Sequence, residues 1–174
     1  MLKIFTTQFS GIMNKIATNE ESIEDSARLL AQATIADGTI YLYCKDELQV
    51  LISEALHSLE PLKNVVIYNS ETMPVLQPSD RFIIATRTNE DEEAILLAKA
   101  IQEQHGSVIG ISTITANDKE GLEAFVDVHI DLHCKKGLVP NELGNRVANA
   151  TSMAALVVFF GIRLALNEIL AEQD

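Results

Sequence analysis

The stretch that decides the fold reads Asp80-Arg-Phe-Ile-Ile-Ala-Thr-Arg-Thr-Asn-Glu-Asp91. Its apolar part, residues 81–85, is short, continuous and rich in branched and aromatic side chains, as in a strand covered on both faces. Hydroxyl and amide side chains follow at once, and a long helical pattern then runs over 89–105, with Asn89 expected as its cap. The stretch therefore predicts a strand, a polar loop and a helix.

The same alternation extends outward in both directions. We expect four more strands at 39–44, 64–68, 107–112 and 126–132, and further helices at 48–59, 117–125 and 151–171. Apolar spacing also predicts two N-terminal helices within 1–37, the second with Thr18 and Glu21 at capping-box spacing. Parallel strands need crossover helices, so the pattern predicts a three-layer α/β/α fold with a five-stranded parallel sheet, preceded by two helices.

The length and net charge of the chain limit its domain organisation and its possible partners. The 174 residues suit one domain, divided into N-terminal helices (1–37), an α/β core (38–150) and a C-terminal helix (151–174). The net charge of −12 opposes binding to nucleic acid or to an anionic membrane. The apolar run at 153–162 is too short to span a bilayer, and the N-terminus does not resemble a signal peptide. We expect a cytoplasmic protein in which Cys44 and Cys134 are free thiols.

Three loops are expected to meet at one edge of the sheet, because right-handed crossovers place every strand-to-helix loop there. They are residues 44–47, 86–89 and 112–115. A helix start favours an anion, and Arg87 can add a bidentate phosphate contact. The alternative is that Asn89 only caps the helix, that Arg87 is solvated, and that the acidic residues at 90–93 repel a phosphate. The candidate ligand-binding residues are Lys45, Thr86, Arg87, Thr88, Asn89, Ser112 and Thr113.

Other polar clusters carry less specific signals. Glu54 and His57 share a helix face and could act as an acid–base pair, or simply form a surface pair. The group His129, Asp131, His133 and Cys134 has no compact metal-ligand spacing, and no phosphate-loop or dinucleotide-binding motif occurs, so we expect neither a metal nor a cofactor. Lys135 and Lys136 form the main local basic spot, and Arg146 follows soon after. These residues could reach over the ligand edge or a neighbouring subunit, or they could be ordinary loop residues.

The order of elements resembles the sugar isomerase (SIS) domain, most closely the phosphoheptose isomerase type. Residues 39–44 resemble the first strand of that group, residues 80–91 its third strand and phosphate loop, and residues 94–111 the helix and strand that follow. The stretches 54–61 and 135–140 are similar to an uncharacterised bacterial SIS-related family.

The resemblance implies a flavodoxin-like strand order, a phosphorylated sugar as partner, and a homodimer or homotetramer whose N-terminal helices pack between subunits. SIS domains usually have a glycine- and serine-rich first loop, where this chain has Lys45-Asp46-Glu47. This departure favours a non-catalytic phosphosugar-binding or regulatory protein. A phosphoheptose-type isomerase, and an interaction protein whose pocket has decayed, are the alternatives.

Overall fold

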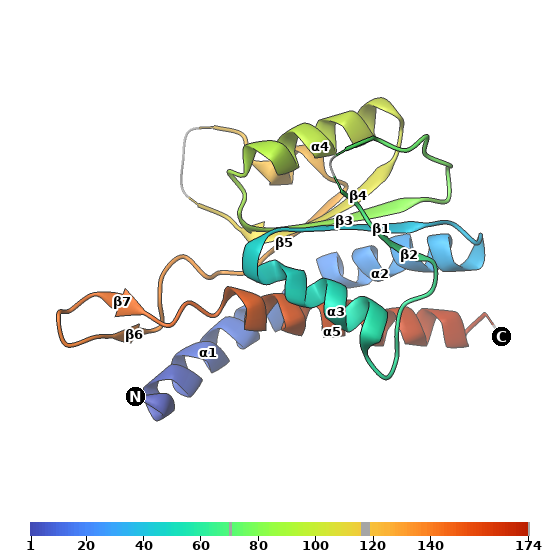
Figure 1. The fold of residues 1–174 in the computed structure, drawn as a ribbon. Coiled ribbons are helices and arrows are strands. Elements are labelled where there is room, and N and C mark those ends of the chain that lie inside the picture. Colours follow the sequence, from blue (N-terminus) through green and yellow to red (C-terminus); the bar gives the residue numbers. More distant parts are fainter. Residues whose placement is uncertain (70, 116–118, 174) are drawn as a thin grey trace.

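A five-stranded parallel sheet forms the centre of the protein, with helices on both faces (Figure 1). The computed structural model describes residues 1–69, 71–115 and 119–173. The strand order is β2-β1-β3-β4-β5, so the expected flavodoxin-like topology is confirmed. The strands are β1 (Ile40–Cys44), β2 (Val65–Ile67), β3 (Arg81–Thr88), β4 (Ser107–Thr113) and β5 (Val128–Asp131).

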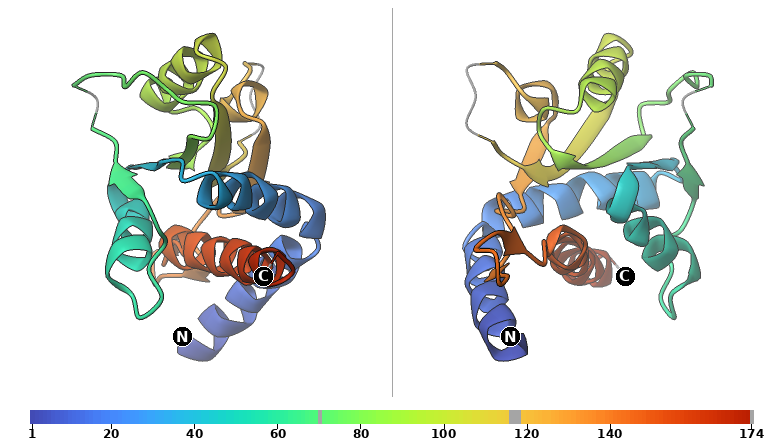
Figure 2. Two further views of the ribbon diagram at one scale, coloured as in Figure 1. Left: turned by 90° about the vertical axis from the view of Figure 1, so that its right-hand side faces the viewer. Right: turned by 60° about the vertical axis from the view of Figure 1, so that its left-hand side comes forward.

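The helices divide into two unequal layers. One face of the sheet carries α4 (Glu92–Glu103) and the short 3-10 helix η2 (Leu122–Phe125). The other face carries α2 (Glu20–Ile35), η1 (Asp46–Gln49), α3 (Val50–His57) and α5 (Thr151–Ala171), with α1 (Leu2–Ala17) outside them. The two expected N-terminal helices are thus present. Figure 2 shows that α1 extends away from the sheet, on the side opposite α4.

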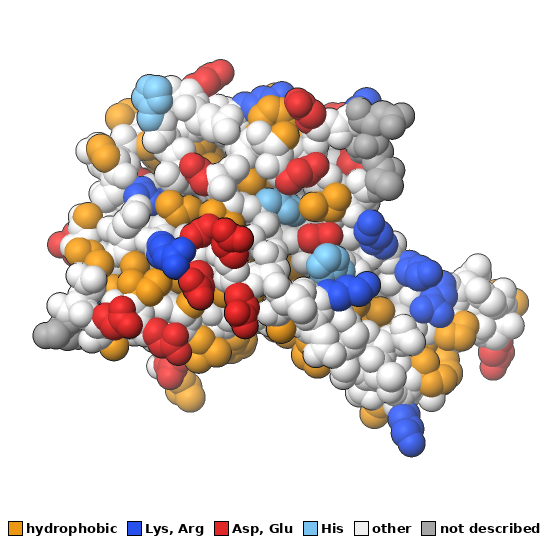
Figure 3. Space-filling view, turned by 180° about the vertical axis from the view of Figure 1, so that it is seen from behind, with side chains coloured by type: hydrophobic (Ala, Val, Ile, Leu, Met, Phe, Trp, Pro, Cys, Tyr) orange, Lys and Arg blue, Asp and Glu red, His pale blue; other side chains and the backbone are white. Residues whose placement is uncertain are grey.

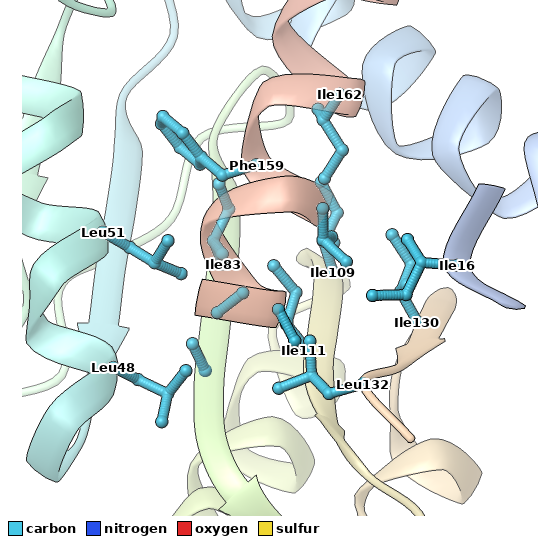
Figure 4. Packing of buried hydrophobic residues seen from close by; sticks show 14 of the residues in the cluster. Ile16, Leu48, Leu51, Ile83, Ile109, Ile111, Ile130, Leu132, Phe159 and Ile162 are labelled. Atoms are coloured by element: carbon cyan, nitrogen blue, oxygen red, sulfur yellow. The ribbon is translucent and has the colours of Figure 1, made fainter. Parts of the chain in front are cut away.

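Alternate residues of the central strands enter two separate cores, because successive side chains in a strand point to opposite faces. Ile83 and Ala85 face α2, α3 and α5, whereas Phe82 and Ile84 pack under α4. Figure 4 shows the larger core, where Phe159 and Ile162 of α5 lie over the strands. Both faces of β3 are buried, which explains its uninterrupted apolar sequence.

The region after β3 differs from the prediction. The strand continues through a register shift after Ala85, and Thr88 pairs with Thr113, so the expected loop residues 86–88 belong to the strand. The α4 helix begins at Glu92, and its cap is Asp91, whose carboxylate accepts a 2.9 Å hydrogen bond from Ala94 N. The prediction that Asn89 caps this helix was therefore wrong. The reason is that Asp91 stands one residue before the first helical turn.

Two other local predictions also need correction. The Thr18 hydroxyl donates to Lys15 O at the end of α1 rather than capping α2, and no side-chain cap is recorded for α2. Residues 133–149, for which the sequence pattern predicted neither a strand nor a helix, contain an antiparallel hairpin, β6 (Val139–Pro140) and β7 (Arg146–Val147). Of the helix expected at 117–125, only η2 forms within the described residues, since residues 119–121 are not helical. Residues 117 and 118 lie outside the described part.

The α5 helix is long and apolar enough, by length and composition alone, to cross a membrane. It nevertheless packs on α2 as a core helix, with Ala155, Val158 and Ile162 buried. Its buried Arg163 forms ion pairs with Glu54 and Glu60. Apolar side chains at the start of α1, Leu2 and Ile4, are exposed. A homo-oligomer contact through this helix stays a prediction, as does the cytoplasmic location.

Gly38 and Gly11 provide a matched test of the packing between α2 and the sheet. A β-carbon on Gly38 would overlap the carbonyl group of Ser79, whereas one on Gly11 would meet nothing within 4 Å. Gly38→Ala should lower the free energy of unfolding by roughly 1–3 kcal/mol, because backbone must shift. Gly11→Ala should raise it by about 0.5–1 kcal/mol, since alanine favours a helix. Urea unfolding measures both, and shifts of the same sign would contradict the packing.

Candidate functional site

Strand register brings the loops after β1, β3 and β4 together, as the sequence predicted. Cys44 is paired with Ala85, and Ala85 with Ile111, so the three strands end side by side. The amide of Lys45 donates to Ala85 O at 3.0 Å, and the amide of Asn89 donates to Thr113 O at 3.0 Å. We refer to residues 45–47, 86–91 and 112–115 as the rim.

Lys45 lies at the rim between two carboxylates from the start of α4. Its ammonium group is 2.8 Å from Asp91 Oδ2 and 2.9 Å from Glu93 Oε2, and Tyr43 also donates a hydrogen bond to Glu93. The hydrogen bonds to Asp91 and Glu93 raise the pKa of Lys45, and the bond from Lys45 lowers the pKa of Glu93. Lys45 is therefore a fixed cation, held by acidic side chains of the same chain.

Arg87 is the second cation of the rim, and it too has an internal partner. Its Nε and Nη2 atoms contact the two carboxylate oxygens of Glu47 at 2.9 and 2.6 Å, which is the bidentate geometry that arginine also offers to phosphate. The hydrogen bond from Arg87 lowers the pKa of Glu47. Asp46 follows Lys45 in the chain, and its Oδ2 atom lies 3.6 Å from Arg87 Nη2. Its backbone is left-handed, with φ of 49°, a conformation that favours glycine.

The remaining candidate residues are mostly buried and bonded within the protein. Ser112 lies 2.8 Å from His129 Nε2, and Thr113 accepts a hydrogen bond from Cys134 N. Asn89 accepts from Thr115 N and donates to Glu123, while Thr86 donates to the Thr88 carbonyl. Thr86 thus bonds within β3, whereas Ser112, Thr113 and Asn89 join neighbouring strands and loops to one another. The cations of the rim, Lys45 and Arg87, reach solvent with side chains that are 29% and 53% exposed. They share this surface with the exposed carboxylates of Asp46 and Glu90.

A small apolar cavity adjoins the Lys45 end of the rim. It has a volume of about 290 Å³ and is lined by Tyr43, Tyr68, Met73, Glu93, Leu96, Leu97 and Ala100. Tyr43 and Tyr68 meet edge to face, with ring centroids 6.2 Å apart. Glu93 therefore borders both this cavity and the ammonium group of Lys45.

Glu54 and His57 lie apart from this arrangement. The carboxylate of Glu54 is 3.7 Å from Arg163 Nη1, and among the described residues no hydrogen bond or ion pair joins Glu54 to His57. His57 is the last residue of α3, a helix that runs from the rim back toward the opposite edge of the sheet. The sequence placed both residues on one helix correctly, but the structure does not pair them.

The histidines near β5 also have protein partners. Burial lowers the pKa of His129, which favours its neutral form beside Ser112. Asp131 lies 3.1 Å from His133 Nδ1 and accepts hydrogen bonds from the amides of Ile114 and His133. Within the described ranges, no three His, Cys, Asp or Glu side chains come together to hold a metal ion.

Sequence reasoning missed the partners of the two cations. The carboxylates of Glu47, Asp91 and Glu93 contact Lys45 and Arg87. They therefore occupy the places that a bound anion would take beside these cations. The acidic run at the start of α4 was the only available signal, because it indicated that negative charge gathers there. The aromatic cavity needs Tyr68, which follows β2, beside Tyr43 of β1. No local sequence pattern predicts that these two residues meet.

This strand order, with two preceding helices, is the fold of sugar isomerase (SIS) domains. A structure from Listeria monocytogenes, described as a candidate sugar-phosphate isomerase, matches with a TM-score of 0.69 and 17% identity, over 98% of this chain and 90% of that one. The Vibrio vulnificus NanR protein complexed with ManNAc-6P matches with a TM-score of 0.62 and 8% identity, over 98% and 62%. At these identities the likeness concerns the fold alone.

The chain belongs to the family described as a domain of unknown function, DUF2529, whose model matches residues 1–170. A relative from Bacillus subtilis (strain 168), the uncharacterized protein YwjG, is 43% identical over 176 residues. That alignment covers 99% of each chain.

Cys44 borders the rim, but burial raises the pKa of its thiol to about 12. Each pKa unit lowers the reactive thiolate fraction about tenfold, so iodoacetamide at pH 8 should alkylate Cys44 at least about 100-fold more slowly in the native protein than in urea. Peptide mass spectrometry over a time course measures this rate. Equal rates in the two states would show that the thiol is accessible and reactive.

Proposed function

We propose that this protein binds a phosphorylated sugar at the rim and does not isomerise it. The observation that carries the proposal is the arrangement of Lys45 and Arg87, which lie on adjoining loops and are held by carboxylates at the surface. The complex of the NanR protein with ManNAc-6P shows that a protein of the same fold binds a phosphosugar. A phosphate dianion matches both cations of the rim in charge, and it matches Arg87 in geometry.

Binding requires the phosphate to replace carboxylates that already contact the cations. Arg87 is 53% exposed and Glu47 32% exposed at the side chain. Exposed ion pairs of this kind contribute only about 0–1 kcal/mol, so a phosphate with two charges can displace Glu47 at small cost. The carboxylates of Glu47, Asp91 and Glu93 compete with a ligand for the two cations, so weakly charged ligands do not displace them.

The aromatic cavity beside Lys45 supplies a place for the sugar. Pockets for small molecules combine apolar walls with a few polar groups that fix orientation. Tyr43 and Tyr68 offer ring surface, and the exposed carboxylate of Glu93 offers an acceptor for sugar hydroxyls. A phosphate that replaces Glu93 at Lys45 would leave this carboxylate available to the sugar.

The absence of isomerisation rests on the position of the candidate acid–base pair. Proton transfer needs a group within hydrogen-bond reach of the reacting carbon or oxygen. Glu54 is bonded instead to the buried Arg163, and His57 ends a helix that leads away from the rim. These placements favour binding over phosphoheptose-type isomerisation.

Two variants should change sugar-phosphate affinity in opposite directions. Arg87→Ala removes a charge-assisted contact and should weaken binding at least about tenfold. Glu47→Gln removes the competing charge from Arg87 and should tighten binding by roughly threefold or more. Isothermal titration with a panel of ketose and aldose phosphates, followed by a turnover assay on each ligand that binds, measures both claims.

The matched controls are Arg28→Ala and Glu24→Gln, which alter an exposed ion pair on α2, at 2.8 Å, with the same charge changes. Neither control should change affinity by more than about twofold. No binding by any sugar phosphate would favour an interaction protein and overturn the proposal. Interconversion of ketose and aldose phosphates would establish the isomerase instead.

A further inference from the structure

A second cavity lies between α1 and the connection from β5 to α5. Its volume is about 440 Å³, and its walls come from one face of α1, from the residues after β5, and from the β6–β7 hairpin. Figure 2 shows α1 and the hairpin side by side at this end of the molecule. The lining residues are Gln8, Gly11, Ile12, Lys15, His133, Lys135, Lys136, Gly137, Leu138 and Arg146.

The cavity is strongly basic in an acidic protein. It gathers four of the 13 Lys and Arg residues of a chain whose net charge is −12, and its lining includes no Asp or Glu. Figure 3 shows blue side chains gathered over this region, beside a histidine. Within the part of the chain that the structure describes, Lys15, Lys135 and Lys136 form no ion pair, in contrast to Lys45 and Arg87 at the rim.

The backbone around the cavity holds its arginine in place. Arg146 donates from Nε to Gly137 O and from Nη2 to Leu138 O, both at 3.0 Å, which leaves other guanidinium N–H groups for a ligand. Gly137 is itself closely packed, since a β-carbon there would overlap the backbone of Val147. The hairpin thus presents Arg146 from a fixed position next to two lysines.

We propose that this cavity is a second binding site, for a compact anion that carries two or more phosphate charges. Four cations without internal counter-ions around one cavity attract a multiply charged anion more strongly than a singly charged one. The lining contains no Phe, Tyr or Trp, and its imidazole, that of His133, is paired with Asp131, so a diphosphate or bisphosphate group fits it better than a nucleobase does. None of the lining residues belongs to the rim, so this site does not depend on sugar-phosphate binding there.

Isothermal titration with inorganic pyrophosphate at constant ionic strength tests the site. The unmodified protein should bind pyrophosphate at least about tenfold more tightly than orthophosphate, because more charges are matched. The double variant Lys135→Gln/Lys136→Gln should weaken pyrophosphate binding at least about tenfold. The control Arg28→Gln/Lys63→Gln removes two cations from other surfaces and should change the affinity by less than about twofold.

Three results would overturn this proposal. They are no binding of pyrophosphate at millimolar concentration, equal weakening by the cavity variant and the control, and equal affinity for pyrophosphate and orthophosphate. A circular dichroism spectrum of each variant excludes misfolding as the cause of lost binding. Loss of sugar-phosphate binding in Arg87→Ala concerns the rim, so the two proposals fail separately.

Discussion

The pairing of β3 between β1 and β4 is the constraint on which the rest of the structure depends. β3 is buried on both faces, and its neighbours pair with it in parallel, so their carboxyl ends lie at one edge. The apolar side chains of β3 hold α4 on one face and the layer of α2, α3 and α5 on the other. Without this register, Lys45 and Arg87 would not belong to one surface, and the rim would not exist.

Electrostatics at the rim follow from the acidic character of the chain. Each cation there is neutralised by carboxylates from the same or the adjoining loop, so the surface is satisfied without a ligand. Such a site discriminates through competition, because an anion binds only if it satisfies Arg87 better than Glu47 does. The basic cavity under the hairpin works differently, since its lysines have no internal carboxylate to displace. The two proposed anion sites therefore differ, because the cations of the rim have carboxylate partners within the protein and the lysines of the cavity do not.

The sequence pattern was sufficient for the parallel sheet, because continuous apolar runs such as 81–85 occur where a strand is covered on both sides. The strand order was expected only from the resemblance to SIS domains. It was insufficient for side-chain direction at the strand ends. Thr86, Asn89 and Ser112 have the polarity of ligand-binding residues, yet their side chains bond to other groups of the protein. Only the tertiary structure distinguishes these two roles. The basic cavity was also beyond local reasoning, since it joins Lys135 to Lys15, which is far away in the chain.

The central claim is that a sugar phosphate binds by replacing the internal carboxylates of the rim. Nuclear magnetic resonance of the assigned protein tests it most directly, through the side-chain Nε–H signal of Arg87 and the backbone amides of residues 45–47 and 86–91 during titration with a sugar phosphate. The account predicts saturable shifts concentrated at these signals, with the Arg87 Nε–H resonance changing as Glu47 is displaced. Saturable shifts elsewhere, with the Arg87 signal unchanged, would contradict it.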